Sequence, residues 1–375
     1  MSYYLLPSKN IVIDILSEVS RNTSLAPYIS PSLDYYIQQM NTELNANIES
    51  VHALEYAQKN INPYEYLFTN VPGSKFAVSK MKPFSYEFYS FLEMIYTLNI
   101  FDHFINRKIS TFIYGQHAKS IIECIDIVRE SYIHEHCKEC IKRHIDFMYI
   151  ELECYGSLET YIYSFLSCIR TILQHQNWDG IAVIKMDTIV HKPILDILFL
   201  LTSLYEKVYI IKPNASNLCN GERYIVAKKF IGCVKRIDAY LLKITEILLH
   251  AKTKNVLFSS IIKHDLPYYF LNKMEEVNII IGNQYLENVE QIIHLLKNKM
   301  KEDKIENRKK TNIQKCIQWC DKYKIPYNKF IERVNIFLNV QQEQEQEQEQ
   351  EQEQEQDQEQ EQDQEQDDEN KVILD

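Results

Sequence analysis

Glycine is scarce in this sequence: only 7 of its 375 residues are glycine. Loops that bring a nucleotide against the backbone usually need several glycines, because glycine alone tolerates both the close approach and left-handed backbone angles. The composition therefore argues against a glycine-rich phosphate-binding loop of the usual kind. Long apolar runs are lacking too, and none opens the chain. We therefore expect no membrane contact and no secretion signal.

The sequence also lacks a regular cysteine framework, since its nine cysteines are scattered. We expect free thiols and a reducing compartment, and not a secreted protein. One short cluster, Cys137-x-x-Cys140 with His134, His136 and His144, has ligand types that zinc favours. A structural zinc site needs a second ligand pair at a set distance, and none is evident. The alternative is a polar surface helix, and we expect no bound metal.

The sequence has fewer basic than acidic residues, with a net charge of −11, but the excess of acid is confined to one segment. Residues 341–375 contain 16 acidic residues and one lysine, a net −15, and mostly alternate glutamine with glutamate or aspartate. Such a tail cannot bury apolar surface and is expected to stay solvated. The remaining 36 acidic and 40 basic residues give the body +4. A mildly basic body permits contact with RNA phosphates without requiring it.

Residues 179–230 contain the most informative pattern, an alternation of strand-like and helix-like segments. A β-branched run ends at Lys185, and a segment with helical spacing begins at Pro193. Lys212-Pro213 stops the next strand, and a polar loop then ends at Glu222, before another β-branched run. By pattern alone, Lys185 lies either at the solvent end of its strand or in a cleft.

This order of elements resembles the C-terminal half of FtsJ-type RNA ribose 2′-O-methyltransferases, with the divergent members of large DNA viruses most similar in character. The resemblance implies an α/β fold: a Rossmann-like methyltransferase sheet with helices on its faces, plus helical N-terminal and C-terminal extensions. It also implies S-adenosylmethionine as cofactor, RNA, possibly an mRNA cap, as partner, and a cytoplasmic or virion-associated location. Lys185 and Glu222 occupy two places of the family's Lys-Asp-Lys-Glu tetrad, and residues 212–216 look like its Lys/Arg-Pro-x-x-Ser loop.

Three positions depart from the family pattern. Ser90 stands where the helix lysine is expected, and Lys80 or Lys82 could replace that lysine only if their loop folds back. Glu151 stands at the place of the tetrad aspartate but is one methylene longer, a displacement large enough to slow catalysis. After the first predicted strand only Gly115 remains of the glycine-rich loop. That loop is either an altered cofactor loop or a plain strand-to-helix turn.

The resemblance assigns catalysis to Lys185, Glu222 and Glu151, and cofactor binding to Gly115 and Glu151. A lysine would stabilise the developing ribose alkoxide while carboxylates orient it. Two functions follow: a 2′-O-methyltransferase with a degenerate cofactor loop, or a catalytically inactive relative that binds RNA or scaffolds other subunits. A zinc-dependent interaction module is a third, weaker hypothesis.

The predicted organisation has four parts. Residues 1–60 form a helical extension, which either caps the core or binds substrate, and 61–232 form the methyltransferase-like domain. Residues 233–340 form a helical region, and 341–375 form the acidic tail. Within the domain, one sheet is predicted from strands near 111–114, 145–151, 181–186, 207–211 and 223–229. The strand ends at Tyr114, Glu151 and Lys185 should lie together, and the short spacing between Gly115 and Glu151 predicts a reduced flank beyond them.

Overall fold

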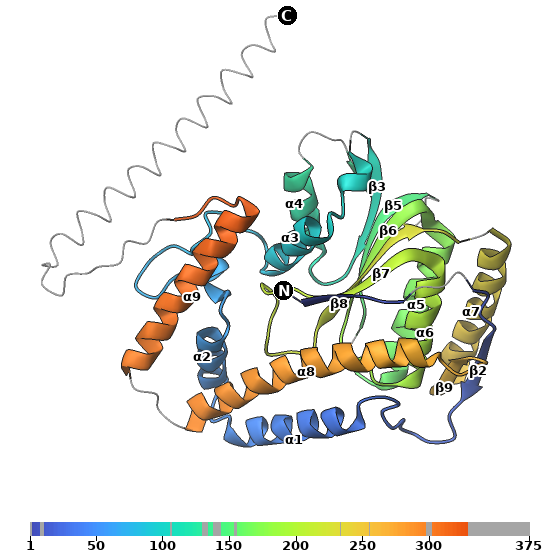
Figure 1. Cartoon of the computed structure of the whole chain (residues 1–375), viewed down its shortest axis with the longest axis horizontal. Coiled ribbons are helices and arrows are strands. Elements are labelled where there is room, and N and C mark those ends of the chain that lie inside the picture. Colours follow the sequence, from blue (N-terminus) through green and yellow to red (C-terminus); the bar gives the residue numbers. More distant parts are fainter. Residues whose placement is uncertain are drawn as a thin grey trace, which may run out of the picture. The chain divides into compact units, whose positions relative to one another are not determined.

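A seven-stranded sheet forms the centre of the computed structural model (Figure 1), in the order β1-β7-β8-β6-β5-β3-β4. The strands are β1 (Ser2–Leu5), β3 (Ile109–Tyr114), β4 (His134–Cys137), β5 (Ile145–Glu151), β6 (Gln176–Met186), β7 (Tyr205–Lys212) and β8 (Arg223–Phe230). The structure describes residues 2–7, 11–105, 107–129, 134–137, 144–153, 156–232, 234–254, 256–297 and 302–328.

Strand directions divide the sheet into two parts. Neighbours β4, β3, β5 and β6 run parallel, whereas β8 is antiparallel to both β6 and β7. The five predicted strands therefore lie in one sheet, as expected. The ends at Tyr114, Glu151 and Lys185 meet at one edge, because β3 pairs with β5 and β5 with β6. Carboxyl ends of adjacent parallel strands are the usual place for ligands in open α/β sheets.

Helices cover both faces of the sheet, which confirms the predicted α/β fold class (Figure 1). On one face α3 (Glu87–Leu98) packs through Phe91 against the rings of Phe147 and Tyr149 in β5, and α4 (Ala118–Val128) lies beside α3. The alternate β5 residues Met148 and Ile150 belong to the main core, which includes α5 (Leu158–His175) and α6 (Lys192–Leu204). The strand period of two explains this division.

The N-terminal and C-terminal regions, which were predicted to be helical, also contain strands. We expected residues 11–19 to be helical, but β2 (Ile15–Val19) pairs with β9 (Phe258–Ile262), and β1 joins the central sheet. Short β-branched segments such as these are decided by a distant pairing partner, which local spacing cannot reveal. The helices of these regions are α1 (Pro31–Asn47), α2 (Val51–Ile61), α7 (Val234–Lys254), α8 (Tyr268–Lys297) and α9 (Glu302–Tyr323).

The long helix α8 contacts both α1 and α2, and α9 contacts the short helix η1 (Glu65–Leu67). A second short helix, η2 (Asp102–Phe104), follows α3. Within the described ranges, no helix has the length and apolarity needed to cross a membrane. The acidic tail lies outside the described residues, and the four-part division of the chain stays a prediction.

The Cys/His cluster is only partly described. Residues 134–137 are strand β4, so the alternative of a polar helix is wrong there. Tertiary pairing with β3 overrides the polar composition of this segment. Residues 138–143 lie outside the described residues, and the expectation of no metal stays a prediction.

Candidate active site

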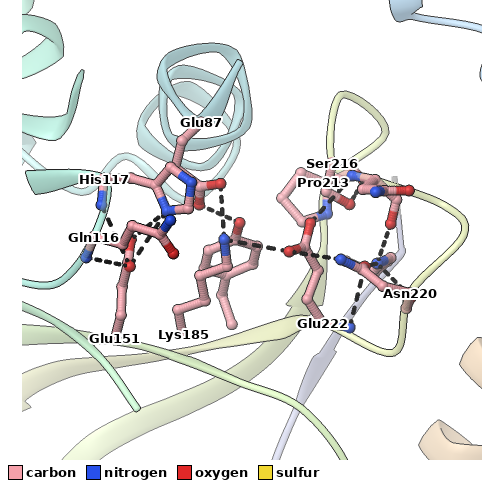
Figure 2. Close-up of polar contacts among 12 residues, drawn as sticks. Glu87, Gln116, His117, Glu151, Lys185, Pro213, Ser216, Asn220 and Glu222 are labelled. Atoms are coloured by element: carbon pink, nitrogen blue, oxygen red, sulfur yellow. Dashed lines mark hydrogen bonds and ion pairs between the residues drawn. The ribbon is translucent and has the colours of Figure 1, made fainter. Parts of the chain in front are cut away.

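The strand register brings the sequence-predicted residues together at one edge of the sheet. Glu151 pairs with Lys185 across β5 and β6, and Lys185 pairs with Tyr224 across β6 and β8. Glu222 immediately precedes β8. Three adjacent strands therefore present their side chains at the same height, beneath the N-terminus of α3. Figure 2 shows this arrangement.

We call Lys185, Glu87, Glu222 and Glu151 the Lys185 cluster. The Lys185 ammonium Nζ lies 2.9 Å from Glu87 Oε2 and 3.2 Å from Glu222 Oε2, between the two carboxylates (Figure 2). The Glu87 side chain is fully buried, and only 13% of the Lys185 side chain is exposed. The Tyr224 hydroxyl donates to Glu87 Oε1. Lys185 is thus held by a carboxylate on each side.

The Tyr149 hydroxyl connects the two halves of the cluster. It lies 3.2 Å from Glu87 Oε1 and 3.1 Å from Glu151 Oε1, and can donate to one of them at a time. Burial raises the pKa of Glu87, although Lys185 opposes the rise. Burial alone would lower the pKa of Lys185, but Glu87 and Glu222 together raise it above its ordinary value. Lys185 is therefore held in its charged form, in a cluster with more carboxylates than cations.

Glu222 is fixed by the loop after β7. It accepts from the Asn217 backbone N–H at 3.1 Å and from Asn220 Nδ2 at 3.1 Å. Lys212 braces the same loop from inside, donating to the Asn217 and Asn220 carbonyls at 2.8 and 3.2 Å. Burial lowers the pKa of Lys212 to about 8. This lysine of the predicted Lys-Pro-x-x-Ser loop therefore supports the loop and does not face the cluster.

Glu151 turns away from Lys185 and binds the turn that opens α4. We call these contacts the Glu151 cap (Figure 2). Its Oε2 accepts from the backbone N–H of Gln116 at 2.8 Å and of His117 at 3.4 Å, and its Oε1 lies 3.1 Å from His117 Nδ1. The N-terminus of a helix attracts anions, because its first N–H groups lack intrahelical partners. Here the chain supplies that anion itself.

Gly115 lies directly beneath the Glu151 side chain. Its φ of 144° falls in the region that favours glycine. A Cβ at this position would meet Glu151 Cγ at 2.5 Å. The close approach that glycine permits is therefore used by Glu151.

These contacts test whether the residues present suit S-adenosylmethionine, the cofactor that the resemblance implies. A cofactor held at this edge would need the surface of Gly115 and the free N–H groups at the start of α4 for its anionic end. Glu151 takes both. As arranged, Glu151 leaves no room for the cofactor against Gly115. The sequence-based assignment of Gly115 and Glu151 to cofactor binding stays a prediction.

The Glu151 cap predicts a measurable shift in the titration of His117. The bond between the His117 imidazole and Glu151 raises the pKa of His117 above 6.5, and the charge of Glu87 acts in the same direction. Burial and the charge of Lys185 lower this pKa but do not outweigh the bond. The Tyr86 ring packs beside the imidazole. Burial raises the pKa of Glu151, but the bond to His117, the charge of Lys185 and the Tyr149 hydroxyl outweigh burial and lower it below 4.5.

The sign of the linkage follows from these shifts. The stability from protonated His117 is fully present below pH 6.5 and is lost as pH rises through its folded-state pKa. The stability from ionised Glu151 is present above pH 4.5 and is lost as pH falls through its folded-state pKa. NMR titration should therefore give His117 a pKa above 6.5 in the native protein and a lower pKa in Glu151→Gln, with His117→Asn used for assignment. An unchanged pKa in Glu151→Gln would contradict the cap.

The structure corrects the residue that α3 contributes. Sequence reasoning pointed to Ser90, but Ser90 is fully buried with no hydrogen-bond partner for its hydroxyl, and Glu87, one turn earlier, contacts Lys185. Lys80 and Lys82 are exposed, and neither occurs among the described contacts of Lys185. Where the resemblance implies a lysine, the cluster therefore holds an acid. Acids within an otherwise apolar helical stretch were the available signal, and they narrow the choice to Glu87 and Glu93.

Comparison with known proteins adds little beyond this geometry. No protein-family profile and no curated protein matches the chain. Among solved structures, human methyltransferase-like protein 13 in complex with SAH gives a TM-score of 0.26 at 7% identity, over 44% of this chain and 93% of that one. A Haemonchus contortus N-methyltransferase, in complex with phosphomonomethylethanolamine and S-adenosylhomocysteine, gives a TM-score of 0.24 at 13% identity, over 39% of this chain and 38% of that one. Scores this low do not assign a family or a function.

Proposed function

We propose that this protein is a non-catalytic relative of RNA methyltransferases, which keeps the sheet and uses its carboxyl edge to bind RNA. The Glu151 cap is the observation that carries the proposal. A carboxylate of the chain occupies the backbone N–H groups of Gln116 and His117 and lies against Gly115. The surface that a methyl donor would need is thereby filled by the protein itself.

The state of Lys185 supports the same conclusion. The pKa of Lys185 is raised by its two carboxylates, which argues against a role as general base but leaves the ammonium charged, as stabilising an alkoxide would require. An alkoxide developing beside Lys185 would also meet Glu87 and Glu222, which already satisfy the ammonium. Their negative charges oppose a third anion at this place. The cluster is better suited to holding α3 on the sheet than to stabilising a transition state.

Support for RNA as partner comes from charge. Residues 1–340 have a net charge of +4. Two exposed lysines are near the site in sequence: Lys82, five residues before Glu87, and Lys119, two residues after His117. Lysines in such positions can pair with phosphates, which gives an affinity that falls as salt rises.

A paired measurement tests this function. The purified protein should bind a single-stranded RNA of about a dozen nucleotides, with an affinity that falls as salt is raised from 50 to 200 mM. With radiolabelled S-adenosylmethionine it should transfer no methyl group to capped or uncapped RNA. Lys82→Ala combined with Lys119→Ala should weaken RNA binding and reduce its salt dependence, whereas Lys243→Ala, on the outer helix α7, should not. Turnover above background, or an absence of RNA binding, would contradict the proposal.

Methyl transfer from S-adenosylmethionine to RNA ribose, possibly at an mRNA cap, is the second candidate. The positions of Lys185, Glu222 and Glu151 at one sheet edge favour it, because these are three of the four places of the tetrad. Methyl transfer would require Glu151 to leave the α4 N-terminus before the cofactor bound. Calorimetric titration with S-adenosylmethionine separates the two functions, since micromolar binding by the native protein would favour the enzyme.

A further inference from the structure

A cavity lies beside the Lys185 cluster, between the segment α2–η1 and the loop after β7. It has a volume of about 160 Å³, and we call it the Tyr64 pocket. Tyr86, which immediately precedes Glu87, and Asn217, whose N–H donates to Glu222, both line it. Lys185 and its three carboxylates do not line it. The pocket therefore adjoins the cluster but is a separate site.

The lining combines rings with amide groups. Tyr64, Phe68 and Tyr86 supply aromatic surface, and 40% of the Phe68 side chain is exposed. Asn62 is held in place, because its Oδ1 accepts from the Tyr64 N–H at 3.2 Å and its Nδ2 donates to Glu65 at 3.1 Å. Asn217 is held likewise, with its Oδ1 accepting from the Cys219 N–H at 2.8 Å. Preorganised amides beside rings are suited to a planar ligand with its own donors and acceptors.

The volume and charge of the pocket limit the class of ligand that it can bind. A cavity of roughly 150 Å³ accommodates one benzene ring, whereas drug-sized ligands need about 300–1,000 Å³. The Tyr64 pocket is therefore large enough for one ring system and too small for a whole nucleotide cofactor. Its charged lining residues are Glu55, Glu65 and Lys59, a net negative set that disfavours a phosphate inside.

We propose that the Tyr64 pocket binds one unpaired nucleobase of single-stranded RNA, with the phosphates remaining outside. The proposal rests on the RNA-binding function proposed above and gives that function a location. Stacking of a base on an aromatic side chain contributes about 1–3 kcal/mol, which corresponds to a factor of roughly five to a hundred and fifty in affinity.

The test compares a fluorescent RNA of twelve nucleotides with an abasic strand of the same length, using the full-length protein and fluorescence anisotropy. The native protein should bind the RNA at least tenfold more tightly than the abasic strand. Phe68→Ala should remove that preference, because this ring is partly exposed and its loss spares the fold. Tyr35→Ala removes an exposed ring on α1, outside the pocket, and should change nothing. Asn62→Asp, with a melting temperature measured for every variant, checks that pocket charge matters without loss of a ring.

Each outcome separates the two proposals. Equal affinity for both strands, or unchanged RNA binding by Phe68→Ala, would overturn the pocket while leaving RNA binding in place. An absence of RNA binding by the native protein would overturn both. Protection of the native protein against thermal unfolding by millimolar free adenosine, lost in Phe68→Ala, would support the pocket independently of any strand.

Discussion

Lys185→Ala is expected to lower the free energy of unfolding by about 3–5 kcal/mol, the cost typical of removing one partner from a buried ion pair. The substitution would leave Glu87 and Glu222 buried without their shared cation. Chemical denaturation followed by circular dichroism gives the measurement.

A matched control is available on the surface. Lys229 pairs with Glu206 at 3.0 Å, but more than 40% of each side chain is exposed. Lys229→Ala should therefore cost about 1 kcal/mol or less. The double variant Lys185→Met with Glu87→Gln should recover part of the loss, since it removes one buried charge of each sign. A cost for Lys185→Ala no larger than that for Lys229→Ala would show that the cluster does not stabilise the fold.

Glu151→Ala is expected to create binding of S-adenosylmethionine where the native protein shows none up to millimolar concentration. The substitution frees the Gln116 and His117 N–H groups and uncovers Gly115. Two hydrogen bonds of about 0.5–1.5 kcal/mol each contribute about 1–3 kcal/mol together, a gain of roughly five to a hundred and fifty-fold, so a dissociation constant below about 200 µM is expected. Isothermal titration calorimetry measures the binding directly.

Glu153→Ala serves as the control, because it removes an exposed acid from the same segment without touching the α4 turn. It should leave the native behaviour unchanged. No binding by Glu151→Ala would mean that the cap is not what excludes the cofactor. Tight binding by the native protein would instead favour the methyltransferase.

The sequence predicted the strands of the central sheet well because their signal is local. The apolar runs that end at Tyr114, Glu151 and Lys185 have strand character in themselves, and parallel strands bring their carboxyl ends to one edge. The edge strands β1 and β2 were not predicted. Their partners, β7 and β9, lie about two hundred residues or more away, and four or five residues do not specify such a pairing.

The sequence alone determined the fold class and three members of the cluster, Lys185, Glu222 and Glu151, because all three flank strands with clear boundaries. Only the tertiary structure decided which residue of α3 faces Lys185 and where the Glu151 carboxylate points. The first choice depends on where α3 lies along its own axis above the sheet, because Glu87 and Ser90 share a helix face one turn apart. The second depends on which way the Glu151 side chain turns from the end of β5. Spacing along the chain does not record either choice, because both arise from packing against residues distant in sequence.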